Sequence, residues 1–252
     1  MLRFFLTIGI VLSGAGILLT VFPQWNYALF KALNHTLSHQ AWLMFTNMAD
    51  FRFLGCILFI LLFPKPVQLT NALIAATLIH YSIKYSKIHF GILRPEYRPD
   101  VVDAIRIGSG YGSENYAMPS GHTASAFMAI VLIAQAYRLG RWKLAALFIY
   151  GIAIAFSRIA VGVHWPADVC AGAATGAVLA LMCNQLHFQY RYMDLVNLCL
   201  CLPFIALAIY ATRNITDMAS LLSEGVLVIA GLAAAIVWIK ACGKQWKIYK
   251  SP

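Results

Sequence analysis

Side chains suited to phosphoryl transfer gather in one stretch of the chain, at the edges of otherwise apolar segments. They comprise three cations, two histidines, a hydroxyl, a glycine and one carboxylate: Lys87, Arg94, Ser120, Gly121, His122, Arg158, His164 and Asp168. Cations can neutralise phosphate oxygens, and a histidine held by a carboxylate can attack phosphorus while a second group protonates the leaving group. The inventory therefore predicts phosphoryl transfer through a histidine.

The first group combines a lysine with an arginine. Lys87 and Arg94 are seven residues apart, close to two helical turns, so a continuous helix would place them on one face about 10 Å apart. Gly91 and Pro95 weaken such a helix, which makes this separation approximate. The compact ammonium charge of a lysine and the planar guanidinium group of an arginine together suit a phosphate group. Taken alone, Lys87 is more typical of a lysine that reaches from the end of a span to the interface.

The second group, Pro119-Ser120-Gly121-His122, is predicted to open a helix. Exposed N–H groups and the helix dipole make a helix start a natural anion site. Ser120 can add its hydroxyl, Gly121 lets an oxyanion approach the backbone, and His122 would lie beside the bound group. Taken alone, the motif is explained equally well by helix capping.

The third group contains a charge, an imidazole and a carboxylate. Arg158 is expected near the end of an apolar span, where a charge is costly. His164 and Asp168 are four residues apart and share a face if their segment is helical. A hydrogen bond between them would fix the tautomer and leave the other nitrogen free to attack phosphorus. His164 alone fits an interfacial histidine equally well, and it is the joint occurrence of the three groups that favours chemistry.

The elements that must position these residues are predicted to be transmembrane helices. The chain has 252 residues, of which 61% are hydrophobic and 11% charged, against roughly 25% charged in soluble domains. A span needs about 20 mostly apolar residues. Eight such runs are expected, at 4–22, 41–63, 67–88, from Pro119 to the basic turn at 138–143, 144–163, 167–186, 195–211 and 221–239. The fold class is therefore an all-α polytopic bundle. It forms one domain, 1–252, with a six-span core at about 1–186 and two further spans at about 195–240.

Four further features refine this picture. Leu29, Phe30, Leu33 and Leu37 recur at helical spacing, with Lys31, Asn34 and His35 between them, and predict a short interfacial helix; a plain solvent loop is the alternative. Asp50 and Arg52 fall inside the second span, where they either pair or face the site.

Positions 89–118, with Asp100, Asp103 and Glu114, form the longest polar connection, and long connections more often have a function than not. The six cysteines show no metal or redox spacing and are interpreted as packing residues.

The positive charge of the chain is interpreted as a topology signal. A net charge of +10 would suggest nucleic acid in a soluble protein, but here the basic residues cluster at the ends of the spans. With the candidate phosphate ligands set aside, the basic 138–143 turn and the C-terminal lysines favour both termini inside. The three groups then lie on the outer face. The three groups lie on the same side of the membrane in either orientation, because the chain crosses the membrane twice, in the fourth and fifth spans, between the second group and the third.

Together the three groups resemble the signature of the type 2 phosphatidic acid phosphatases, also called lipid phosphate phosphatases. The matching motifs are Lys87-x6-Arg94-Pro95, Pro119-Ser120-Gly121-His122 and Ser157-Arg158-x5-His164-x3-Asp168. The resemblance implies His164 as nucleophile, Asp168 as its partner and His122 as general acid. It further implies a phosphate cradle and no metal or other cofactor, the cradle being Lys87, Arg94, Ser120, Gly121 and Arg158.

The expected protein is a bacterial inner-membrane phosphatase acting on a lipid phosphate or diphosphate at the outer face. Undecaprenyl diphosphate, phosphatidylglycerol phosphate, phosphatidic acid and lipid A phosphates are all open as substrates. A lipid phosphotransferase that uses the same covalent intermediate is the first alternative, and a non-enzymatic lipid transporter is the second. Vanadium-dependent haloperoxidases share the signature but are typically soluble, and eight apolar runs argue against that family.

Overall fold

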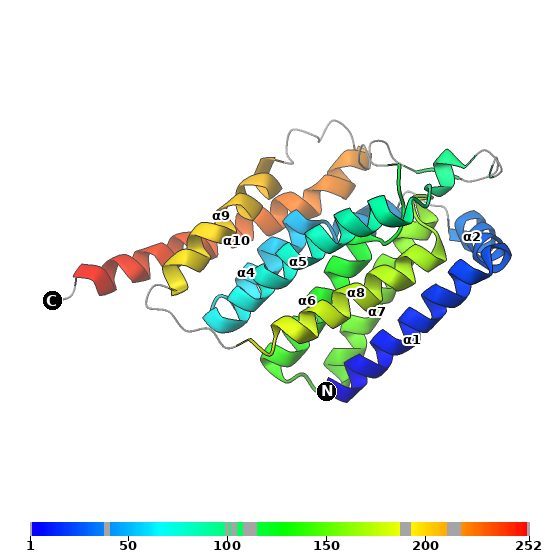
Figure 1. Ribbon diagram of the computed structural model, residues 1–252. Coiled ribbons are helices and arrows are strands. Elements are labelled where there is room, and N and C mark those ends of the chain that lie inside the picture. Colours follow the sequence, from blue (N-terminus) through cyan, green and yellow to red (C-terminus); the bar gives the residue numbers. More distant parts are fainter. Residues whose placement is uncertain are drawn as a thin grey trace.

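The computed structural model describes residues 2–37, 41–98, 101, 105–107, 115–186, 193–210 and 218–250. Within these ranges the chain forms ten α-helices and one short 3-10 helix (Figure 1). The helices are α1 (Leu2–Val21), α2 (Pro23–Leu37), α3 (Ala41–Asn47), α4 (Phe51–Leu62), α5 (Pro66–Phe90), η1 (Pro95–Tyr97), α6 (Gly121–Tyr137), α7 (Arg141–Ala160), α8 (Pro166–Cys183), α9 (Met193–Tyr210) and α10 (Met218–Lys250). Asp100, Asp103 and Glu114 of the polar connection lie outside the described residues.

The predicted all-α membrane bundle is confirmed, but fewer helices than eight are long and apolar enough to cross a bilayer. Among the described residues there are four: α1, α7, α8 and the Glu224–Gly243 part of α10. The pair α3 and α4 would make a fifth, although the two are bent by 55°. The apolar parts of α6 and α9 are shorter, and α5 carries Lys84 and Lys87 near its end. The division into a six-span core and two further spans stays a prediction.

The expected continuous second span is wrong, because Asp50 starts a new helix in its middle. The Asp50 side chain accepts a hydrogen bond from the Arg52 backbone N–H at 2.8 Å and so caps α4. A capping side chain replaces the helical partner of that N–H, which interrupts the helix before it. Of the two alternatives for these charges, pairing or facing the site, the structure shows the pairing: Nε of Arg52 lies 2.8 Å from Oδ1 of Asp50.

The helix predicted between the first two spans is present as α2, with Pro23 in its first turn. Its buried face differs from the expected one. Phe30 is 1% exposed and Asn34 is fully buried, whereas Leu29 is 40% exposed. Asn34 is therefore an inward-facing residue of α2 and not part of a polar outer face.

The centre of the bundle is the packing of α6 against α8. Both helices are buried over most of their length, and α1, α5 and α7 pack around them. Two glycines of α8 permit the close approach: a Cβ added at Gly172 or Gly176 would overlap the carbonyl oxygen of Ser120 or Ala124. Small residues four apart are the usual means by which membrane helices come into backbone contact. The start of α6 is thereby held directly against α8.

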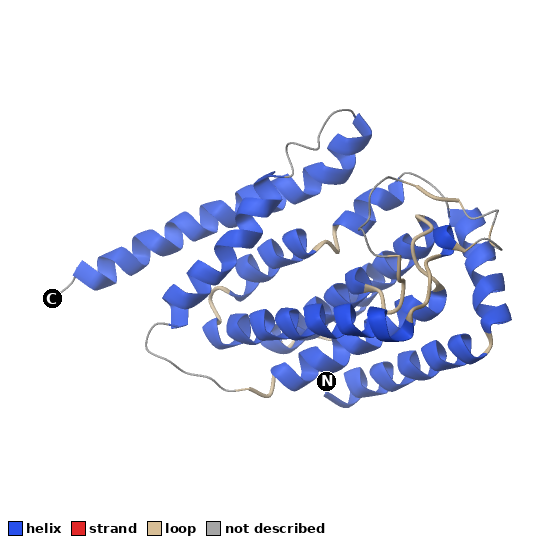
Figure 2. Cartoon of the chain, turned by 45° about the horizontal axis from the view of Figure 1, so that its top comes forward, coloured by secondary structure: helices blue, strands red, loops and turns tan. Residues whose placement is uncertain are grey.

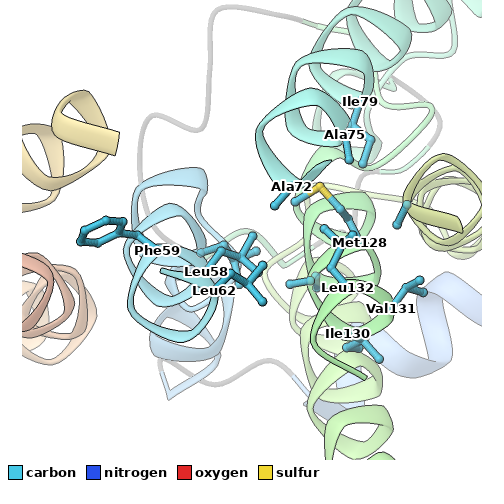
Figure 3. Packing of buried hydrophobic residues seen from close by; sticks show 14 of the residues in the cluster. Leu58, Phe59, Leu62, Ala72, Ala75, Ile79, Met128, Ile130, Val131 and Leu132 are labelled. Carbon is cyan, nitrogen blue, oxygen red and sulfur yellow. The ribbon is translucent and has the colours of Figure 1, made fainter. Parts of the chain in front are cut away.

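The C-terminal helices form a hairpin that packs on α3, α4 and α5, on the far side of the bundle from α1 (Figure 1). Helix α4 connects this hairpin to the central helices. Leu58 and Leu62 of α4 point toward α6, while Phe59 points the opposite way, toward the hairpin (Figure 3). Gly55 of α4 leaves room for the ring of Phe204 on α9.

Candidate active site

The first predicted group lies where α5 ends. Gly91 adopts a left-handed conformation, with φ of 59°, and its N–H donates to the carbonyl of Lys87. This glycine cap ends the helix, so Lys87 lies in its last turn and Arg94 lies beyond it. The expectation that both residues share one helical face is therefore wrong.

A short pairing of extended segments carries Arg94 to the start of α6. The Arg94 N–H donates to the carbonyl of Asn115 at 3.0 Å, and the Ala117 N–H donates to the carbonyl of Ile92 at 2.7 Å. The pairing ends only three residues before Ser120. The loops that follow α5 and precede α6 lie together at one end of the bundle (Figure 2). The first and second groups come together there, with Arg94 only 4% exposed.

The second group begins α6 as predicted. Ser120 is the N-cap residue, is fully buried, and its backbone N–H donates to the carbonyl of Asp168 at 2.9 Å. Its Oγ accepts a hydrogen bond from Thr123 Oγ1 at 3.1 Å. Gly121 and His122 form the first turn, where N–H groups lack helical partners. The Ser120–Asp168 contact joins the second group to the third.

The third group spans the end of α7 and the start of α8. Arg158 lies in the last turn of α7 and is 1% exposed. His164 precedes α8, so it does not share a helical face with Asp168 as expected. The turn still brings them together, with Nδ1 of His164 3.3 Å from Oδ2 of Asp168. The same carboxylate oxygen accepts the Trp165 N–H at 2.7 Å, which fixes the carboxylate at the helix start.

Trp165 closes the arrangement by linking the third group to the first. Its indole N–H donates to the carbonyl of Leu93, next to Arg94, at 2.8 Å. Its ring packs on Phe30 of α2, with ring centroids 4.9 Å apart. The segments that carry Arg94, Ser120 and His164 are therefore joined by hydrogen bonds at one end of the bundle.

The environment of His164 favours a neutral imidazole. His164 lies in the turn between α7 and α8 and is 2% exposed. Burial, and next the positive charge of Arg158, lower the pKa of His164 well below its usual 6.5. Arg94, Lys87 and His122 act on it in the same direction. A neutral imidazole whose Nδ1 faces a carboxylate can carry its lone pair on Nε2, as a nucleophile requires.

Several residues that build the site were missed by sequence reasoning. On α2, the Asn26 side chain accepts the Ala167 N–H at 3.0 Å, and Asn34 donates to the carbonyls of Ile159 and Ala160 at 3.1 Å. On α3, Thr46 contacts Arg158. The only sequence signal was an amide or hydroxyl side chain within a helix, and this does not identify its partner.

Within the part of the chain that the structure describes, no three His, Cys, Asp or Glu side chains form a group that would hold a metal ion. The free cysteines include three buried residues, Cys56, Cys183 and Cys201. Independence from metal stays a prediction.

Comparison with known proteins agrees with this geometry. The family model described as the PAP2 superfamily matches residues 65–192, a range that contains all three groups. The chain belongs to the PAP2 superfamily. Its resemblance to the type 2 phosphatidic acid phosphatases, proposed from the three motifs, is thereby confirmed.

Two similar proteins extend the comparison within the PAP2 superfamily. A protein of Porphyromonas gingivalis named lipid A 4'-phosphatase is 29% identical over 145 residues, which cover 53% of this chain and 56% of that protein. The match thus spans little more than half of that relative's length. The crystal structure of LpxE from Aquifex aeolicus superimposes with a TM-score of 0.52 at 25% identity, covering 64% of this chain and 96% of that one.

Proposed function

We propose that this PAP2 protein is a membrane phosphatase that removes phosphate from a lipid phosphate or diphosphate through a phosphohistidine. One observation carries the proposal: a buried His164, held by Asp168, lies among the charges of Lys87, Arg94 and Arg158. Three cations around a neutral imidazole suit a phosphate dianion better than any neutral ligand.

In the first step, Nε2 of His164 attacks phosphorus and the bond from phosphorus to the ester oxygen breaks. The cations and the N–H groups at the start of α6 stabilise the negative charge on the phosphoryl oxygens. His122, in the first turn of α6 and protonated when the phosphate dianion is bound beside it, donates its proton to the departing alkoxide or phosphate. Asp168 stabilises the positive charge that His164 acquires in the phosphohistidine.

In the second step, water attacks the phosphohistidine. His122, now neutral, accepts a proton from that water, the N–P bond breaks, and the electron pair returns to His164. Inorganic phosphate leaves and the starting state is restored. No step needs a metal, because the three cations neutralise the phosphate oxygens.

The substrate is proposed to be a lipid of the bilayer that surrounds the bundle. The name of the Porphyromonas gingivalis relative makes a lipid A phosphate the first candidate, followed by undecaprenyl diphosphate, phosphatidylglycerol phosphate and phosphatidic acid. The charge distribution supports a site on the outer face, and the bacterial relatives support a bacterial inner membrane.

Phosphate release from a panel of these four lipids, by purified protein in excess chelator, tests the proposal. We expect release from at least one lipid and loss of release in His164→Ala. Absence of release from all four lipids would contradict hydrolysis. A phosphotransferase would instead pass labelled phosphate to an acceptor lipid, and a transporter would move lipid even after loss of His164.

A further inference from the structure

Arg158 contacts a residue that lies outside the family match. Thr46, in the last turn of α3, is fully buried, and its Oγ1 accepts hydrogen bonds from Nη1 of Arg158 and from Oγ of Ser157. A guanidinium is planar, with its donors in fixed directions. Arg158 is 1% exposed, so water does not orient its guanidinium group. A hydrogen-bond acceptor held in a fixed position, here Thr46 Oγ1, therefore sets the plane in which the other N–H donors of Arg158 point.

The position of Thr46 is itself fixed against α7. The break between α3 and α4 begins at Met48, whose carbonyl accepts a hydrogen bond from the Tyr150 hydroxyl at 2.6 Å. Tyr150 lies on α7, eight residues before Arg158. The end of α3 is thus attached to α7 at two places, which fixes Thr46 relative to Arg158.

Helix α10 attaches to the same break from the other side. Glu224 forms a side-chain hydrogen bond with Asn47, the neighbour of Thr46, and its Oε2 lies 4.0 Å from Nη2 of Arg52. Arg52 is paired in turn with Asp50, the residue that caps α4. Glu224 therefore contacts both helices that meet at the break.

We propose that Thr46 is a positioning residue that orients Arg158 toward the bound phosphate, and that Glu224 holds Thr46 in place through Asn47. The C-terminal hairpin, which lies beyond residues 65–192 of the PAP2 match, is then part of the frame of the phosphate site. This inference rests on the proposed function only in taking Arg158 as a phosphate ligand.

The decisive comparison is Thr46→Val against Thr46→Ser. Valine has the shape of threonine but accepts no hydrogen bond, whereas serine keeps the hydroxyl. The readouts are kcat/KM on the best lipid substrate and the affinity for orthovanadate, followed as the vanadate-dependent rise in Tm of purified protein. We expect T46V to lose about 10- to 100-fold in both, as a buried charged donor loses its acceptor, and T46S to stay within about threefold of the parent.

Glu224 provides a second pair of variants. Glu224→Ala removes the acceptor for Asn47 and should weaken vanadate binding about 2- to 10-fold, while Glu224→Gln keeps an acceptor oxygen and should weaken it less. Because Glu224 is partly exposed, E224A decides the question if T46V fails to fold. Unchanged vanadate affinity in both T46V and E224A, or equal losses in T46V and T46S, would overturn the inference. Wild-type protein that binds vanadate but releases no phosphate would contradict the proposed function alone.

Discussion

At the scale of single residues, the two histidines differ in their surroundings and should differ in their roles. His164 is buried and faces Asp168, whereas His122 is only partly buried in the first turn of α6. The first arrangement suits a nucleophile and the second suits an acid that meets the leaving group. Separate substitutions can distinguish these roles.

We expect His164→Ala to lose turnover of every substrate, because the proposed phosphohistidine cannot form. The loss in His122→Ala should depend on the leaving group. A positioned acid contributes about 10²–10⁴-fold, and an acidic phenol departs without a proton. The measurement compares H122A on a lipid phosphate and on an aryl phosphate. Equal losses on both would show that His122 is not the acid, and turnover by H164A would remove the nucleophile.

The protonation of His164 gives a second prediction. Since its pKa is lowered well below 6.5, the folded protein at pH 6.5 keeps this imidazole neutral, while an unfolded chain would be half protonated. Below that pH the unfolded chain binds more protons than the folded one, so the free energy of unfolding decreases as pH falls from about 6.5 toward the lowered pKa of His164. NMR of protein labelled in its histidine rings should therefore show no titration of His164 near 6.5.

Arg158→Met should raise the pKa of His164 toward its usual value, because the charge of Arg158 is the largest contribution after burial. Arg141→Met is the matched control: Arg141 begins the same helix at its opposite end and should leave the titration unchanged. Titration of His164 near 6.5 in the parent protein would contradict the proposed neutral nucleophile.

At the scale of elements, the site depends on the closeness of α6 and α8. The Ser120 N–H reaches the Asp168 carbonyl at 2.9 Å only because Gly172, one turn further along α8, has no side chain. A methyl group there would push the start of α6 away from His164 and Asp168. Misplacement of reacting groups by about 1 Å can cost about 10²-fold in rate.

We therefore expect Gly172→Ala to lose about 10²-fold in kcat and to lower Tm, since overpacking a tight contact costs about 1–3 kcal/mol. Gly14→Ala is the control, because an added Cβ at Gly14 in α1 meets nothing within 4 Å. The measurement is kcat with Tm of purified protein. Full activity in G172A would mean that this glycine does not set the site geometry.

The sequence predicted the local elements of the site better than their connections. Ser120 was expected to begin a helix and does so as the N-cap residue, although its hydroxyl makes no capping hydrogen bond and contacts Thr123 instead. His164 was placed on a helix because four residues separate it from Asp168, but Pro166 marks the first helical position. Thr46 could not be found, since its partner Arg158 is 112 residues away and spacing carries no information at that distance.

At the scale of the whole molecule, the hydrogen bonds around the site lie at one end of the bundle and the basic turn at 138–143 lies at the other. Helix α7 runs between them, from Arg141 to the last turn that holds Arg158. Trp142 is 78% exposed, as expected for an aromatic residue at a membrane interface. The orientation of α7 therefore decides which leaflet supplies the substrate.

We expect the 138–143 turn to face the cytoplasm, because Arg138, Arg141 and Lys143 lie in a short connection of the kind that is retained inside. A reporter that is active only outside the cytoplasm should be silent when fused near Arg141 and active when inserted near Gly110. A fusion after Gly243 provides the control, since the C-terminal lysines predict the same silence as Arg141. Activity near Arg141 together with silence near Gly110 would place the site at the inner leaflet. The His164 chemistry would be unaffected, but the substrate would then have to come from the cytoplasmic side.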